Sequence, residues 1–316
     1  MPTVNTISGP VETADLGFTL MHEHIIVESP GVKENFPILN RKAEIEGAAA
    51  KLKEVMARGV KTLVDLTPGD WRDIPFVKEV VDRSGMQVLV ATGIYWEVPH
   101  HFRSTTGRSI DYIADLFVRD IRDGIMDTGV KAGIIKCATD EPGVTPDVER
   151  ILRAAAKAHR ATGVPISTHT HPASEVGLKQ QDVFESEGVD LSRVVIGHSG
   201  DTEDTSYLSK LCDRGSYIGM DRFGIDVFLP TDKRVATIAK MCELGYAEKM
   251  VLSHDASCYF GWVDPPLREK LVPNWHFNHI PDDVLPALRK LGVSESQIGT
   301  MTVDNPRHIF ERQGAY

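Results

Sequence analysis

The sequence predicts an α/β protein built as a closed (β/α)8 TIM barrel. Short runs rich in β-branched residues alternate with segments of helical periodicity along the whole chain. The strand candidates number eight, as a closed barrel of βα units requires. Residue types that bind metals follow several of these strands directly, at the end where such barrels carry their active sites.

The predicted strands are short apolar runs. They span residues 18–21, 62–65, 88–91, 133–136, 165–168, 194–197, 217–220 and 250–253. Helical periodicity covers residues 43–58, 74–84, 110–126, 146–162, 173–187, 202–213 and 231–244. This alternation indicates βαβ units and a parallel sheet. An open doubly wound sheet is the alternative, but no G-x-G-x-x-G motif opens the first helix.

The ends of several predicted helices carry their own sequence signals. Thr145 is a suitable N-cap, and Pro146 occupies the first helical position. Glycines stand where four helices are expected to end, namely Gly59, Gly85, Gly163 and Gly188.

The strand–helix repeat ends after the eighth strand. Residues 256–280 form a predicted long loop that is rich in proline and aromatic residues. Such a loop over a barrel mouth is typical of a substrate lid or pocket wall, and an oligomer contact or packing over the barrel rim is the alternative. Two closing helices are expected at about 282–291 and 295–310. The whole chain, residues 1–316, is expected to form one domain.

Composition narrows the class of partner and the compartment. The chain has 316 residues, of which 41% are hydrophobic and 25% charged. A net charge of -10 without a dense Lys/Arg run disfavours a nucleic-acid partner. We find neither a signal peptide nor a run of about 18 apolar residues that would predict a membrane span. The four cysteines are scattered, which favours free thiols and a cytoplasmic location.

Candidate metal ligands follow five of the predicted strands. His22 and His24 follow the first strand and point to one face, because strand side chains alternate with a period of two, while Glu23 points away. The others are Lys136, His169, His198 and Asp255, after the fourth, fifth, sixth and eighth strands. Closure of the barrel would bring these residues together, as in a two-metal hydrolytic centre. Imidazole and carboxylate ligands suit zinc, cobalt, manganese or iron.

Lys136 is the unusual candidate because an ammonium group cannot ligate a cation. If the amine loses its proton and reacts with CO2, it becomes a carbamate, N6-carboxylysine, which can bridge two cations. Burial near positive charge favours the neutral amine that this reaction needs. A lysine that reaches solvent or holds a substrate anion is one alternative, and a Schiff-base lysine is another.

Other polar residues near the strand ends are expected to have roles other than that of a metal ligand. Residues 168–171 repeat the His-x-His pattern, but His169 lies nearer the strand end, whereas His171 is expected in the loop. His254 should face away from the barrel axis if the next residue faces inward. Asp65 is expected to accept hydrogen bonds from loop amides, with support of a ligand as the alternative. Arg222 is expected to bind a polar part of the substrate or to orient an aspartate, with an ordinary loop salt bridge as the alternative.

The candidate ligands resemble the binuclear amidohydrolase pattern with a carboxylated lysine, and more narrowly the phosphotriesterase family. The segments MHEHI, GIIKC, THTH, IGHSGD, GMDRFG and LSHDA are similar to that family's strand ends, and the resemblance spans nearly the whole chain. It implies that His22, His24 and Asp255 hold one metal and that His169 and His198 hold the other. The resemblance also implies a homodimer.

The resemblance further implies that carboxylated Lys136 and a hydroxide bridge two divalent metal ions, with zinc as the first expectation. Within the family, the chain is most similar to the phosphotriesterase-like lactonases. That branch places a tyrosine, an arginine and a tryptophan around the substrate, at positions that match Tyr95, Arg222 and Trp262. The branch often has a cysteine two residues after the metal aspartate, where this chain has Ser257, which is thus also a candidate pocket residue.

The implied activity is the opening of lactones, N-acyl homoserine lactones (quorum-sensing signals) in particular, with promiscuous hydrolysis of organophosphates. Asp255 is the expected catalytic residue that accepts the proton of the hydroxide and delivers it to the leaving alkoxide. The alternatives are a dedicated phosphotriesterase (aryldialkylphosphatase), a carboxylesterase and a mononuclear deaminase-like enzyme. A barrel that binds a ligand without catalysis is the alternative from a different class.

Overall fold

The computed structural model describes residues 1–36, 38–311 and 314–316. Its centre is a parallel sheet with the strand order β10-β9-β8-β7-β6-β5-β4-β3-β11. The strands are β3 (Thr19–Val27), β4 (Thr62–Asp65), β5 (Gln87–Gly93), β6 (Ile134–Ala138), β7 (Ile166–His169), β8 (Val194–Ile196), β9 (Tyr217–Met220), β10 (Met250–Leu252) and β11 (Ser257–Phe260). Strands β3 to β10 are the eight strands that the sequence predicts.

The segment that follows β10 closes the curled sheet onto β3. The Asp255 N–H donates to the His22 carbonyl at 3.0 Å, and the His24 N–H donates to the Ala256 carbonyl at 2.8 Å. Strand β11 then pairs with β3 in parallel, with Ser257 opposite His24. These bonds confirm the predicted (β/α)8 barrel.

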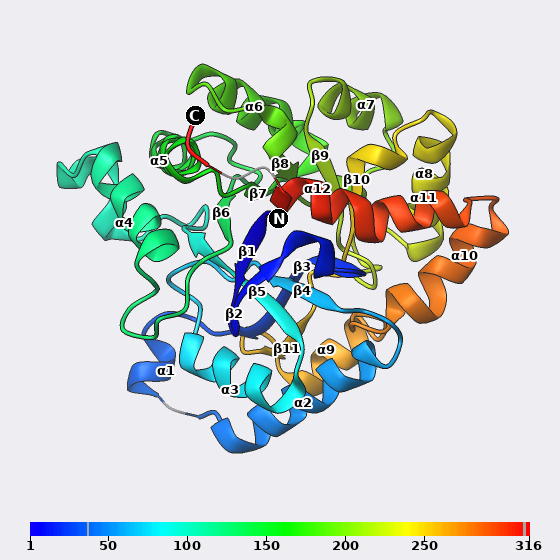
Figure 1. Ribbon diagram of the computed structural model, residues 1–316, viewed down its shortest axis with the longest axis horizontal. Coiled ribbons are helices and arrows are strands. Elements are labelled where there is room, and N and C mark those ends of the chain that lie inside the picture. Colours follow the sequence, from blue (N-terminus) through cyan, green and yellow to red (C-terminus); the bar gives the residue numbers. More distant parts are fainter. Residues whose placement is uncertain (37, 312–313) are drawn as a thin grey trace.

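A ring of helices surrounds the sheet (Figure 1). Its members are α2 (Arg41–Met56), α3 (Ile74–Ser84), α4 (Ile110–Arg122), α5 (Pro146–Thr162), α6 (Val176–Ser186), α7 (Thr205–Asp213) and α8 (Thr231–Glu243). The Thr145 hydroxyl accepts from the Val148 N–H at 3.3 Å, so the predicted N-cap of α5 is present. Gly163 ends the same helix with φ 78°, a left-handed conformation that glycine adopts at low cost. None of the described helices is both long and hydrophobic enough to cross a bilayer.

A hairpin that the sequence analysis did not predict covers the N-terminal end of the barrel. It consists of β1 (Thr3–Thr6) and β2 (Gly9–Glu12), and the Ile7 N–H that follows β1 donates to the Val88 carbonyl of β5 at 2.8 Å. The last helix, α12 (Asn305–Glu311), packs against β1 (Figure 1). Val4, Leu89, Val251 and Phe310 belong to one buried apolar cluster there. This end of the barrel is therefore filled with hydrocarbon.

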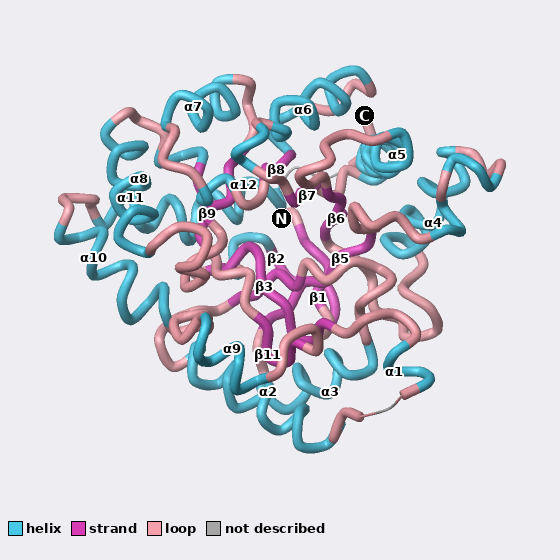
Figure 2. The backbone as a smooth tube through the Cα atoms, turned by 180° about the vertical axis from the view of Figure 1, so that it is seen from behind, coloured by secondary structure: helices cyan, strands magenta, loops and turns pink. Residues whose placement is uncertain are grey.

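The region after β10 differs from the prediction of an irregular loop. Residues 256–280 contain β11 and a helix, α9 (Pro265–Leu271), which lie beside α2 in both views (Figures 1 and 2). The predicted closing helices are present but interrupted. They comprise a π-helical turn (Ile280–Val284) with α10 (Leu285–Lys290), and then α11 (Glu295–Gly299), a second π-helical turn (Thr300–Asp304) and α12. A short helix, α1 (Val32–Asn35), was not predicted either.

Candidate metal centre and substrate cavity

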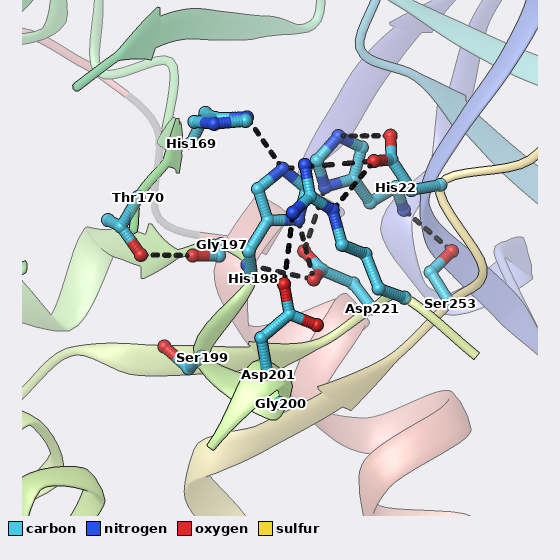
Figure 3. Close-up of polar contacts among 12 residues, drawn as sticks. His22, His169, Thr170, Gly197, His198, Ser199, Gly200, Asp201, Asp221 and Ser253 are labelled. Atoms are coloured by element: carbon cyan, nitrogen blue, oxygen red, sulfur yellow. Dashed lines mark hydrogen bonds and ion pairs between the residues drawn. The ribbon is translucent and has the colours of Figure 1, made fainter. Parts of the chain in front are cut away.

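Two of the candidate histidines share one carboxylate. The His22 Nδ1–H donates to Asp221 Oδ2 at 2.7 Å, and the His198 Nδ1–H donates to Asp221 Oδ1 at 3.1 Å. Figure 3 shows Asp221 between these two residues. Because both Nδ1 atoms are engaged, both Nε2 atoms are left for a metal. Metal-binding histidines usually donate their other ring N–H to a carboxylate in this way, which fixes the orientation of the ring.

His24 is supported through a hydroxyl group. Its Nδ1–H donates to Thr67 Oγ1 at 2.8 Å, and the Thr67 hydroxyl donates to Asp65 Oδ1 at 2.5 Å. The same Asp65 oxygen accepts the Thr67 N–H at 2.9 Å. Asp65 thus satisfies a loop amide, as expected, and also fixes the ring of His24.

His169 presents the opposite ring nitrogen. Its Nε2–H donates to Asp140 Oδ2 at 3.0 Å, while its Nδ1 lies 2.8 Å from His198 Nε2 and 3.0 Å from the Tyr95 hydroxyl. His171, the other histidine of the repeated motif, begins the turn Pro172–Ser174 after β7. The structure therefore turns His169 toward the cluster and leaves His171 in the loop.

Asp255 and Lys136 complete the cluster. Asp255 Oδ1 lies 2.9 Å from His24 Nε2 and 3.3 Å from His22 Nε2. Donor atoms of His22, His198 and Asp255 lie within 4.8 Å of one another. Lys136 Nζ is 3.1 Å from His22 Nε2, in a side chain that is almost fully buried. The structure thus brings the six predicted ligand residues to one place.

Two residues of the cluster have a left-handed backbone. His198 and Asp255 have φ values of 58° and 57°. This conformation costs a non-glycine residue roughly 1–3 kcal/mol and is concentrated at functional sites. The residue before His198 is Gly197, where an added Cβ would lie only 2.0 Å from the Thr168 carbonyl oxygen. The ends of β7 and β8 therefore approach closely enough to require glycine at this position.

Burial sets the charge of the ligands. It lowers the pKa of His22 and His198, and it lowers the pKa of His169 to about 4, so these imidazoles are neutral at neutral pH. Burial also lowers the pKa of Lys136 to about 8. It opposes ionisation of Asp255, but contacts with His22 and His198, the hydrogen bond with His24 and the charge of Arg222 hold the pKa of that carboxyl well below its ordinary value. Neutral imidazoles beside a carboxylate fit divalent metal ions such as zinc.

Arg222 contacts the carboxylate of Asp255, which agrees with the prediction that it orients an aspartate. Its Nε–H donates to Asp255 Oδ2 at 3.1 Å, and Nη1–H donates to Asp201 Oδ2 at 2.9 Å. Asp201 Oδ1 is in turn 2.7 Å from Nη1 of the buried Arg234. Two carboxylates therefore fix the position of the Arg222 guanidinium group, one through Nε and the other through Nη1.

Glu23 faces away from the centre and joins β3 to β10. Its Oε1 accepts from the His254 Nδ1–H at 2.6 Å and from the Ser253 hydroxyl at 2.8 Å. Ser253 Oγ also accepts the His22 N–H at 2.8 Å, as Figure 3 shows. His254 is thus turned away from the cluster, as the strand alternation indicates, and it helps to fix the backbone beside the ligands.

A cavity of about 310 Å³ opens above the cluster. Tyr95, Arg222 and Trp262 line it, together with the six candidate ligands. The rings of Tyr95 and Trp262 lie 4.4 and 4.5 Å from the ring of Trp71. The rest of the wall is largely apolar and includes Val27, Leu66, Ile225, Val227, Phe228, Phe260, Leu271, Val272 and Trp275. Ser257 does not line this cavity and is instead among the residues that line a neighbouring cavity next to α2.

The sequence analysis missed the carboxylates that hold the ligands. Asp140 comes two residues after β6, Asp201 follows β8 within a short turn, and Asp221 comes directly after β9. Each stands where a βα loop begins. The signal available in the sequence was therefore the same one that identified the ligands, an acidic residue just past a strand end.

A family model described as "Phosphotriesterase family" matches residues 2–310. The chain belongs to this family. The "Phosphotriesterase homology protein" of Mycobacterium tuberculosis (strain ATCC 25618 / H37Rv) is 54% identical over the full length of both chains. The "Aryldialkylphosphatase" of Saccharolobus solfataricus is 44% identical over 95% of this chain and 96% of that protein. A solved structure titled as the phosphotriesterase from Mycobacterium tuberculosis superposes with a TM-score of 0.97, at 53% identity, and covers 100% of each chain.

The phosphotriesterase family is one of binuclear metal-dependent enzymes, and this member is a metal-dependent hydrolase. The strand-end cluster of this phosphotriesterase-family chain offers both nitrogen and oxygen donors at one face of the barrel. The aromatic cavity above it can admit a small molecule to those donors.

Proposed function

We propose that this phosphotriesterase-family hydrolase opens lactones, N-acyl homoserine lactones in particular, and hydrolyses organophosphate triesters as a secondary activity. The observation that supports this most is the cavity, whose apolar wall stands directly above the six candidate ligands. An ester can place its carbonyl at the ligands while an acyl tail lies against Trp262 and Phe228. Burial of that tail contributes roughly 0.8 kcal/mol per methylene. A phosphotriester can occupy the same place, so the secondary activity needs no second site.

We propose that His22, His24 and Asp255 hold one divalent cation and that His169 and His198 hold the other, with zinc as the first candidate. Each ring already has one nitrogen engaged by a neighbouring side chain and the other directed at the cluster. Two bound cations would supply a hydroxide nucleophile at neutral pH and Lewis acidity for the developing negative charge.

We propose that Lys136 bridges the cations as a carbamate. Burial brings the pKa of its ammonium group to about 8, so the neutral amine is far more populated at neutral pH than in an exposed lysine. The nitrogen lone pair attacks the carbon of CO2, so an N–C bond forms while one C=O π bond opens onto its oxygen, and one proton passes from the nitrogen to solvent. The product is an anion with two oxygen donors, which removes the conflict of an ammonium group among cation ligands. A Schiff base has no comparable support, because the Lys136 amine lies 3.1 Å from His22 Nε2, within the cluster of candidate metal ligands.

We propose that Asp255 moves the proton. Its carboxylate accepts the proton of the attacking nucleophile and delivers it to the leaving alkoxide as the ring opens. Arg222 orients Asp255 through Oδ2 and stays charged, because the two neighbouring carboxylates raise its pKa despite burial. Burial raises the pKa of Tyr95, so its hydroxyl keeps its proton and can donate a hydrogen bond to the lactone.

The proposed substrate class can be tested by steady-state kinetics on the metal-loaded protein. We expect a higher kcat/KM for a long-chain N-acyl homoserine lactone than for paraoxon. The opposite order would indicate a dedicated phosphotriesterase (aryldialkylphosphatase), and turnover of open-chain esters alone would indicate a carboxylesterase. If none of these compounds is hydrolysed, the proposed lactonase and phosphotriesterase activities are both wrong.

We also propose a cytoplasmic homodimer. The dimer follows from the family resemblance, and the reducing compartment is supported by the cysteines, which are all unpaired and buried: Cys137, Cys212, Cys242 and Cys258. Light scattering coupled to size-exclusion chromatography would test the dimer, since a mass near 34.9 kDa would show a monomer.

A further inference from the structure

Arg234, near the start of α8, is a charged side chain that is only 1% exposed. Its Nη1–H donates to the Gly200 carbonyl at 2.8 Å, in the turn that follows β8 (Figure 3). Its Nε–H donates to the Leu229 carbonyl at 2.9 Å, and its Nη2–H donates to the Ile225 carbonyl at 3.5 Å. One guanidinium group therefore connects the loop after β8 with the loop after β9.

The charge of Arg234 is not needed to pack α8 against the barrel. Val235 and Ile238 are buried apolar side chains of the same helix and supply such packing. A buried guanidinium group costs free energy unless carbonyl and carboxylate oxygens match its charge and its N–H donors. What Arg234 supplies is therefore its set of donors, which are all directed at the two loops.

The loop after β8 carries Asp201, whose two oxygens face two different arginines. Its Oδ2 accepts from Arg222 Nη1–H at 2.9 Å, and its Oδ1 forms an ion pair with Arg234 Nη1 at 2.7 Å. Arg222 in turn donates from Nε to Asp255 Oδ2 at 3.1 Å. The charges thus alternate along these four residues. If Arg234 were lost, the unbalanced Asp201 would draw the Arg222 guanidinium group toward itself and away from Asp255.

The loop after β9 forms part of the wall of the substrate cavity. Ile225, Val227 and Phe228 line the cavity, and the last two are each 61% exposed, so they have little packing of their own. The carbonyls that Arg234 binds belong to Ile225 and Leu229, one on each side of these exposed residues. Arg234 therefore fixes the backbone that presents them to the cavity.

We propose that Arg234 is a positioning residue that couples the orientation of Asp255 to the wall that receives the acyl tail. Through Asp201 it keeps Arg222 in place beside Asp255, and through the two loop carbonyls it holds Phe228 at the cavity. Arg234 itself does not line the cavity and acts only through these neighbours. The inference rests on the proposed lactone hydrolysis, which supplies the reaction by which it is measured.

Two substitutions separate the two links. Arg234→Met keeps an unbranched side chain but loses both links. Its kcat for lactone opening should fall at least about tenfold, since charged contacts are lost, and its KM for a long-chain N-acyl homoserine lactone should rise about fivefold. Arg234→Lys keeps a cation for Asp201 but has no second nitrogen for the loop carbonyls. Its kcat should return to within about threefold of the unsubstituted enzyme, while KM for the long-chain lactone stays raised.

A double substitution and a control test whether the effect passes through Asp201. Adding Arg234→Met to Asp201→Asn should lower kcat no further than Asp201→Asn alone, because coupled residues are not additive. Met241→Ala removes a fully buried side chain near the other end of α8 and is the matched control. It should lower the melting temperature and leave kcat and KM unchanged. Additive losses in the double variant, or an equal loss of kcat in Met241→Ala, would overturn the proposal.

Hydrogen exchange of residues 222–230, followed by mass spectrometry, tests the loop link without any substrate. Exchange should be faster in both Arg234→Met and Arg234→Lys than in the unsubstituted protein. Unchanged exchange in both variants would overturn the proposal. If the unsubstituted protein opens no lactone, the proposed function is wrong, and the exchange measurement still decides whether Arg234 holds the loop.

Discussion

The two ends of the barrel are built from the same strands but with opposite chemistry. At the N-terminal end, the hairpin and α12 cover a core that contains Val4, Val251 and Phe310. At the C-terminal end, the same strands lead into buried histidines, a lysine and an aspartate, each with a polar partner. Hydrocarbon packing at one end stabilises the fold, so the other end can keep buried polar groups and a strained backbone at His198 and Asp255. Substitutions at the two ends should therefore have separable effects.

The largest effect is expected at the C-terminal end, from Asp255→Asn. The amide cannot take a proton, so kcat for lactone opening should fall by roughly 100- to 10,000-fold. The melting temperature should stay close to that of the unsubstituted protein, which circular dichroism can follow. A rate near that of the unsubstituted protein would exclude Asp255 as the proton acceptor.

The complementary effect is expected at the N-terminal end, from Phe310→Ala. Removal of this fully buried ring should lower the free energy of unfolding by roughly 3–5 kcal/mol. Denaturant unfolding measures this, and kcat of the folded fraction should be unchanged. If kcat falls while stability is kept, the two ends are not separable.

A smaller effect is expected where a carboxylate holds two ligand rings. Asp221→Asn should weaken metal binding by roughly 10- to 100-fold, because the amide keeps one acceptor oxygen and so can orient only one of the rings of His22 and His198. Competition with a chelator measures the affinity. Asp232→Asn, an exposed change on α8, is the control, and an equal loss there would assign the effect to net charge.

The smallest effect is expected in the cavity wall. Trp262 is 43% exposed, so Trp262→Ala removes only part of the contact with an acyl tail. We expect kcat/KM for a long-chain lactone to fall about fivefold, equivalent to about 1 kcal/mol of apolar contact. The rate for γ-butyrolactone, which has no tail, should change little, and equal losses for both substrates would remove Trp262 from tail recognition.

The sequence predicts local features of this molecule better than long-range ones. All eight barrel strands follow from periodicity, metal-binding residue types stand at the ends of several of them, and its place at the strand end distinguishes His169 from His171. The pairing of β11 with β3 could not be found in this way, because the two strands lie more than 200 residues apart in the chain. Asp221 is a similar case, since its role depends on two rings from different strands.

Metal analysis of the purified protein, loaded with zinc in bicarbonate buffer and freed of loosely bound metal, tests the proposed centre most directly. The proposal predicts two zinc ions per chain, fewer in Lys136→Ala, and partial recovery of metal and activity in that variant when a short carboxylate such as propionate is added. One zinc ion per chain, with full activity in both the unsubstituted protein and Lys136→Ala, would contradict it.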